Sequence, residues 1–132
     1  MANNILSHKG IQVGKSIKEE NCEIIIDEIF ETSKNYPCKI VYPEDVLVGK
    51  NMNDKSKIKK LDEIKDDDLI LDIGPNTISK IKHIIENSET ILWNGPAGYF
   101  ENQNFASGSY EIAKTIIKKN KENSIYSVVG GG

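Results

Sequence analysis

A chain of 132 residues is long enough for one domain with a hydrophobic core. Its 17 basic and 20 acidic residues, interspersed to a net charge of −3, form no basic face and argue against nucleic acid as a main partner. The sequence has no N-terminal signal pattern and no apolar run near the length that crosses a bilayer, so we expect a cytoplasmic protein with no membrane partner.

The first third of the chain predicts two helices. Residues 1–8 should form a short helix with Ile5 and Leu6 buried, and with His8 in solvent because no carboxylate stands at helical spacing from it. A longer helix follows, since apolar residues recur at i, i+3, i+4, i+7 and i+8, and its apolar face should cover a sheet; these residues are Cys22, Ile25, Ile26, Ile29 and Phe30.

Two features of this region suggest ligand chemistry and are rejected. Gly14-Lys15-Ser16 invites comparison with a P-loop, but Lys9 stands where that motif has its first glycine and no strand precedes it. Cys22 and Cys38 have neither the spacing nor the histidine partners of a metal site, so we expect two reduced thiols.

The rest of the chain alternates between strand and helix patterns. Short apolar runs typical of buried strands occupy residues 38–42, with a possible continuation over 45–48, and residues 69–73, 90–93 and 124–129. Helices are expected after Gly74-Pro75 and from Phe105 to Lys121, and the polar stretch 50–68 should be a solvated excursion that contains a short strand. This alternation predicts an incomplete three-layer α/β fold of the Rossmann-like type, a parallel sheet with helices on both faces.

The stretch from Trp93 to Glu101 is the candidate functional loop. It follows the strand over 90–93, and in parallel sheets ligands bind at the carboxyl ends of strands. Gly95 and Gly98 would allow close approach of the backbone to a ligand, and the Glu101 carboxylate could pair with ribose hydroxyls. A plain Gly/Pro turn with a solvated glutamate remains an equal alternative, because spacing alone does not decide between them.

This stretch resembles the Trp-Asn-Gly-Pro-x-Gly-x-Phe-Glu loop of phosphoglycerate kinases, which lines the nucleotide pocket of their C-terminal domain. Six other motifs agree with that family in order and spacing, and the resemblance covers essentially all 132 residues: Met1-Ala2-Asn3, Val13-Gly14-Lys15-Ser16, Pro43-Glu44-Asp45-Val46, Leu71-Asp72-Ile73-Gly74-Pro75, Phe105-Ala106-Ser107-Gly108 and Val128-Val129-Gly130-Gly131-Gly132. The resemblance implies that residues 1–132 are part of the nucleotide-binding domain, without the N-terminal substrate domain and the segments before Met1 and after Gly132.

The resemblance also assigns roles to individual residues. No complete catalytic set and no metal ligand is implied, and the backbone of the glycine turn would give auxiliary phosphate contacts. The nucleotide-binding residues are Glu101 at the ribose, Asn94 toward the phosphates, Pro96, Gly98 and Tyr99 beside the base, Leu71 on the adenine, Ile70 where the family usually has a glycine beside the base, and Gly131 and Gly132 at the phosphates. Ile70 and Tyr99, which replaces a small aliphatic residue, add bulk to the pocket.

By this resemblance the parent enzyme transfers a phosphoryl group between 1,3-bisphosphoglycerate and ADP in glycolysis, giving 3-phosphoglycerate and ATP, with Mg²⁺ bound to ADP or ATP. Such transfer depends on charge neutralisation and alignment, and the family's arginine, lysines and metal-supporting acid have no matching positions here. We therefore expect the isolated chain to be inactive, with the rest of the kinase chain or a complementary fragment as its partner. The alternative is a truncated or split-gene remnant that needs a complementary segment to fold. A dinucleotide-binding module is disfavoured, because no Gly-x-Gly-x-x-Gly follows a strand.

Overall fold

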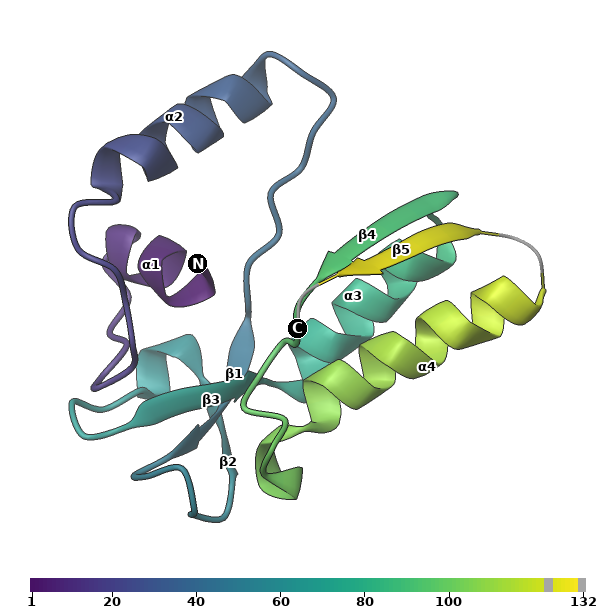
Figure 1. Cartoon of the computed structure of the whole chain (residues 1–132). Coiled ribbons are helices and arrows are strands. Elements are labelled where there is room, and N and C mark those ends of the chain that lie inside the picture. Colours follow the sequence, from purple (N-terminus) through teal and green to yellow (C-terminus); the bar gives the residue numbers. More distant parts are fainter. Residues whose placement is uncertain (123–124, 131–132) are drawn as a thin grey trace.

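The computed structural model describes residues 1–122 and 125–130 (Figure 1). Its helices are α1 (Ala2–His8), α2 (Glu23–Lys34), α3 (Pro75–Glu86) and α4 (Ser107–Lys121), with short 3₁₀ turns η1 (Leu61–Glu63) and η2 (Gln103–Phe105). The strands are β1 (Asp45–Gly49), β2 (Lys57–Lys60), β3 (Leu69–Ile73), β4 (Thr90–Asn94) and β5 (Tyr126–Gly130). The α/β class is confirmed, and the small sheets are those of an incomplete Rossmann-like fold. None of the described helices is long and apolar enough to span a bilayer.

The strands form two separate sheets. β4 and β5 pair in parallel, as predicted. The other sheet has the order β2-β1-β3 and is antiparallel, which corrects the expectation of parallel strands throughout. The reason lies in the connections: residues 50–68 return the chain through β2 and η1 without a crossover helix, and parallel neighbours need such a crossover.

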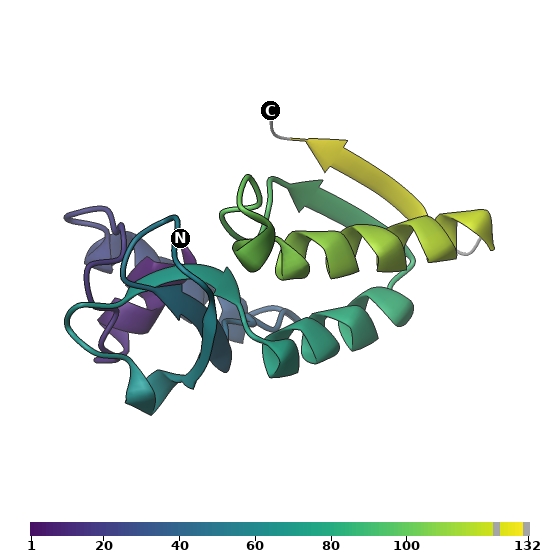
Figure 2. The same cartoon turned by 90° about the horizontal axis from the view of Figure 1, so that it is seen from below.

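Helices α3 and α4 cover one face of the β4–β5 pair (Figure 2). Isoleucines on the inner sides of both helices pack against Ile91 and Trp93 of β4; the buried members of this cluster are Ile78 and Ile85 of α3, Ile112 and Ile116 of α4, and Ile73 of β3. On the opposite face, Leu92 and Tyr126 are 75% and 69% exposed. Within the described residues, helices therefore cover only one face of this pair.

Two expectations for residues 22–42 are wrong. The segment over 38–42 is not a strand but a connection between α2 and β1, which Figure 1 shows as an extended stretch. Helix α2 forms as predicted, yet Ile26 is its only fully buried residue, and Ile25 is 56% exposed. Both results have the same cause, because a strand needs a hydrogen-bonded neighbour and an amphipathic helix needs a sheet to cover, and the described residues supply neither here.

Helix α1 forms as predicted, with Ile5 and Leu6 buried. His8 has a partner that helical spacing did not reveal, since its Nε2 lies 2.9 Å from Asp27 Oδ1 on α2. Cys22 and Cys38 are both free thiols.

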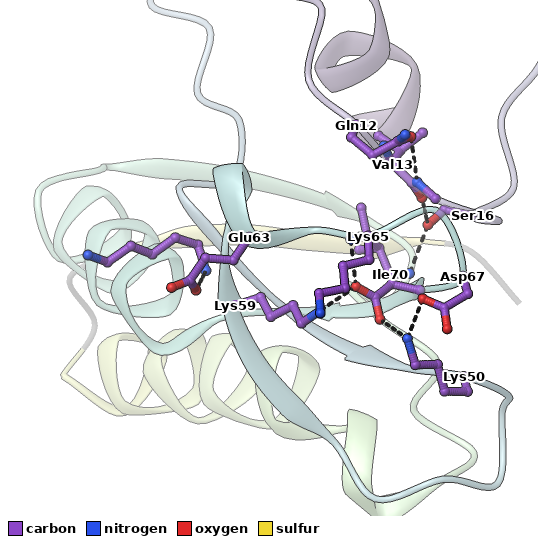
Figure 3. A network of polar contacts seen from close by, with 12 residues as sticks. Gln12, Val13, Ser16, Lys50, Lys59, Glu63, Lys65, Asp67 and Ile70 are labelled. Atoms are coloured by element: carbon purple, nitrogen blue, oxygen red, sulfur yellow. Dashed lines mark hydrogen bonds and ion pairs between the residues drawn. The ribbon is translucent and has the colours of Figure 1, made fainter.

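The turn over residues 13–16 is hydrogen-bonded to the start of β3 (Figure 3). Ser16 Oγ accepts a hydrogen bond from Ile70 N at 2.8 Å and donates one to Val13 O. The Lys15 amide donates to Asp68 O at 2.8 Å. Gly-Lys-Ser is therefore a structural turn, in agreement with the rejection of a P-loop.

A buried carboxylate, Asp45, ties β1 to α3. It is 2% exposed and accepts hydrogen bonds from Asn76 N at 2.9 Å, from Thr77 N at 2.8 Å and from Thr77 Oγ1 at 2.7 Å. An acid at this position satisfies the unpaired N–H groups of the first helical turn and complements the helix dipole.

Candidate functional site

The ends of β4 and β5 lie side by side at one edge of their sheet. The two strands run parallel with Asn94 opposite Gly130, and Gly95 N donates to Gly130 O at 3.1 Å. The loop after β4 therefore begins at the same edge of the sheet at which β5 ends, at Gly130. Gly131 and Gly132, assigned to the phosphates, lie outside the described residues.

The loop over residues 95–101 turns back from β4 onto β3. Gly95 has φ +95°, in the region that favours glycine. Ala97 N then donates to Ser109 Oγ at 2.9 Å, and Tyr99 N donates to Leu71 O at 2.7 Å. These two bonds attach the loop to α4 on one side and to β3 on the other.

Gly98 is required by the protein's own packing. A Cβ at this position would lie 2.5 Å from Asp72 Oδ1 and 2.6 Å from Leu71 O, closer than real Cβ atoms come. The glycine was expected to allow approach of a ligand, whereas the structure shows it admitting the loop against β3.

The side chains of Leu71 and Tyr99 share one apolar cluster. Leu71 is 9% exposed and packs with Leu47 and Phe105, and Tyr99 packs against this group. Ile70 belongs to a different cluster with Val46, Val48 and Ile64, since successive strand residues point to opposite faces. The structure therefore brings Leu71, Gly98 and Tyr99 together, while the side chain of Ile70 is on the other face.

Two polar side chains at this edge are open to a ligand. Asn94 and Glu101 are exposed, and neither has a side-chain hydrogen bond or ion pair to any described residue. Pro96 is also exposed, between them along the loop. A carboxylate and an amide without internal partners remain free to bind hydroxyls or other polar groups.

The N-terminus of α4 is not available to an anion, because Asp72 fills it. Asp72 Oδ2 accepts from Gly108 N at 2.8 Å and from Ser107 Oγ at 3.1 Å. Its carboxylate is 1% exposed, and burial raises its pKa above the ordinary aspartate value, against the hydrogen bonds that lower it. Sequence reasoning gave Asp72 no role, although a charged residue within the apolar run of β3 was a visible signal.

The described residues contain no group of three or more His, Cys, Asp or Glu side chains that could hold a metal ion. Two surface pockets lie away from this edge, one beside residues 39–44 and one between α1 and the start of α2, and neither includes a residue of the 94–101 loop.

The chain has an incomplete Rossmann-like α/β fold, with a glycine-bearing loop at the carboxyl edge of its parallel strand pair. The family model described as phosphoglycerate kinase matches residues 1–132. The chain belongs to the phosphoglycerate kinase family.

Named relatives agree with this assignment. The chain is 42% identical over 133 residues to the phosphoglycerate kinase of Wolbachia pipientis subsp. Culex pipiens (strain wPip), covering 100% of this chain and 34% of the relative. It is 36% identical over 134 residues to the enzyme of Xanthobacter autotrophicus (strain ATCC BAA-1158 / Py2), again covering 100% of this chain and 34% of the relative. The chain thus spans about a third of the length of these curated relatives.

Solved structures agree as well. The phosphoglycerate kinase of Coxiella burnetii matches with a TM-score of 0.92 and 31% identity, covering 99% of this chain and 33% of that one. The phosphoglycerate kinase of Pyrococcus horikoshii OT3 matches with a TM-score of 0.72 and 26% identity over the same shares.

Proposed function

We propose that residues 1–132 form part of the nucleotide-binding domain of a cytoplasmic phosphoglycerate kinase. The reaction is phosphoryl transfer between 1,3-bisphosphoglycerate and ADP, giving 3-phosphoglycerate and ATP. The observation that supports this proposal is the meeting of the β4 and β5 ends at one edge, with Asn94 opposite Gly130. That edge is where doubly wound folds bind nucleotides.

The proposed contacts follow from this geometry. The open carboxylate of Glu101 binds the ribose, and Asn94 lies toward the phosphates. The base packs on the cluster that contains Leu71 and Tyr99. Pro96, Gly98 and the backbone of Ile70 border it, and the backbone N–H groups of Gly131 and Gly132 contact the phosphates.

Transfer needs more than these residues. The reaction depends on neutralising phosphate charge and aligning donor with acceptor. Mg²⁺ would neutralise that charge and would arrive bound to the nucleotide phosphates. The remaining cationic groups and the acceptor site would come from the rest of the kinase chain or from a complementary fragment, so the chain alone is inactive.

A second candidate is a remnant that has no activity of its own and requires a complementary segment to fold. The exposed apolar surfaces support it: Leu92 is 75% exposed on the open sheet face, and Ile24 is 73% exposed on α2. Apolar surfaces of this kind favour association with a partner.

Reconstitution separates the two candidates. The chain would be mixed with the remainder of the wPip Wolbachia enzyme, and ATP-dependent phosphorylation of 3-phosphoglycerate would be assayed. The proposed function predicts activity in the mixture and in neither part. A soluble, associated mixture without activity would support the remnant.

Glu101→Ala tests the proposed site within the same assay. We expect KM for ATP to rise about tenfold, since a charge-assisted bond to a hydroxyl contributes roughly 1.5 kcal/mol. The matched control is Glu89→Ala, because Glu89 is an exposed glutamate just before the N-terminal end of β4. Equal KM values for the two variants would remove the ribose assignment.

A further inference from the structure

Asp72 contacts both ends of the segment over residues 98–108, which includes the second half of the loop that the proposed function assigns to the nucleotide. At one end Gly98 packs on its carboxylate, with space for no Cβ between them. At the other end Ser107 and Gly108 donate to Oδ2 at 3.1 and 2.8 Å. Tyr99 and Glu101 lie between these two attachment points.

No described cationic side chain competes with the loop for the Asp72 carboxylate. None of the described basic side chains forms an ion pair with Asp72, and its hydrogen bonds come from Gly108 N, Ser107 Oγ and its neighbour Ile73 N, the last at 2.8 Å to Oδ1. At 1% exposure, these bonds are shielded from water. A charged acceptor bonded to backbone N–H groups at a helix start has a strongly defined position.

We propose that Asp72 is a positioning residue for the nucleotide site, setting the place of the 98–108 segment against β3 and thereby the direction of Tyr99 and Glu101. The inference rests on the proposed function for its ligand. The contacts of Asp72 with Gly98, Ser107 and Gly108, which we call the Asp72 clamp, do not depend on that function, because they exist in the free chain.

Asp45 provides a matched control. It too is a buried aspartate of a β-strand, 2% exposed, that caps the start of the next helix in space, α3. No contact of its carboxylate involves residues 94–108. Asp45→Asn and Asp72→Asn therefore make the same change at two buried helix caps, replacing one acceptor oxygen by an NH₂ donor and removing the charge, and only the second makes it at the proposed clamp.

The clamp is tested by amide hydrogen exchange of the full chain, read residue by residue by NMR. In Asp72→Asn we expect the amides of Ala97 and Tyr99, bonded to Ser109 Oγ and Leu71 O, to exchange at least about tenfold faster. In Asp45→Asn the exchange of these two amides should increase only as much as the lower global stability of that variant explains. Equal acceleration in both variants, or unchanged Ala97 and Tyr99 exchange in Asp72→Asn, would overturn the clamp.

A milder variant covers the case in which Asp72→Asn does not fold. Ser107→Ala removes one exposed donor to Asp72 and leaves the Gly108 bond in place. We expect a smaller acceleration, about threefold, at the same two amides. No acceleration there would count against the clamp.

Titration with Mg²⁺–ADP then tests the nucleotide part. If the unsubstituted chain shows ADP-induced shifts at the 94–101 loop, we expect Asp72→Asn to bind about tenfold more weakly and Asp45→Asn to bind as the unsubstituted chain does. Unchanged binding by Asp72→Asn, together with a loosened loop, would overturn the positioning role and leave the proposed function intact. Absence of ADP-induced shifts in the unsubstituted chain would overturn the proposed function and the nucleotide part of this inference, and the exchange rates would still decide the clamp.

Discussion

Replacing Gly98 with alanine tests how the candidate loop is held on β3. The added methyl would lie 2.5 Å from Asp72 Oδ1 and 2.6 Å from Leu71 O, and one of these two neighbours is backbone. The loop must therefore move outward, which lengthens the 2.7 Å bond from Tyr99 N to Leu71 O.

The expected loss of stability follows from two effects. Overpacking costs about 1–3 kcal/mol and a weakened buried hydrogen bond about 1 kcal/mol, so we expect the free energy of unfolding to fall by roughly 2–4 kcal/mol. This is a large part of the stability of a domain of this size. Urea denaturation followed by fluorescence of Trp93, the single tryptophan, measures it directly.

Gly130→Ala is the matched control. Among the described residues, a Cβ there would meet only Asn94 Oδ1, at an ordinary 3.6 Å, and Gly130 lies in β5 at the same edge. We expect a change within about 0.5 kcal/mol, or slight stabilisation from the smaller backbone entropy of alanine. Equal losses for Gly98→Ala and Gly130→Ala would refute the packing argument.

Three further predictions concern charge and exposed surface. A hydrogen bond from Lys82, and a second from Lys114, lower the pKa of Glu111 to about 2. The stability that the Glu111 carboxylate contributes is therefore present above pH about 4.5 and is lost as the pH falls toward 2. Glu111→Gln should flatten the acid side of the stability–pH curve, and an unchanged curve would contradict this. The buried carboxylate of Asp68 pairs with Lys59 and Lys50, so Asp68→Asn should cost about 3 kcal/mol in urea denaturation. Asp67→Asn removes only an exposed contact with Lys50 and should cost under about 1 kcal/mol, and the reverse order of the two losses would refute this reasoning. Leu92→Lys should reduce self-association in sedimentation velocity, and an unchanged sedimentation profile would show that the open sheet face is not responsible.

Local patterns predicted the elements whose partners lie within the described residues. Helix α3 begins at Pro75, as the Gly74-Pro75 pair indicates, and the polar stretch before β3 does contain a short strand, β2. The edge shared by β4 and β5 was also predictable, because parallel strands place their carboxyl ends together.

Features that depend on distant pairing were not predictable in this way. Residues 38–42 have the apolar pattern of a strand, but no described strand pairs with them. The antiparallel direction of β3 depends on how residues 50–68 return, which composition does not specify. The roles of Gly98 and Asp72 became visible only when the loop was placed on β3, since 26 positions separate them in the sequence.

The central claim is that the edge formed by β4, β5 and the loop packed on β3 binds a nucleotide. Its most direct test is a ¹H–¹⁵N correlation titration of the chain with Mg²⁺–ADP. We expect weak binding, with a Kd of about 1 mM, and shifts concentrated at Leu71, Asn94, Tyr99, Glu101 and Gly130. Shifts centred on the pocket between α1 and α2, or none at millimolar ADP, would contradict the account.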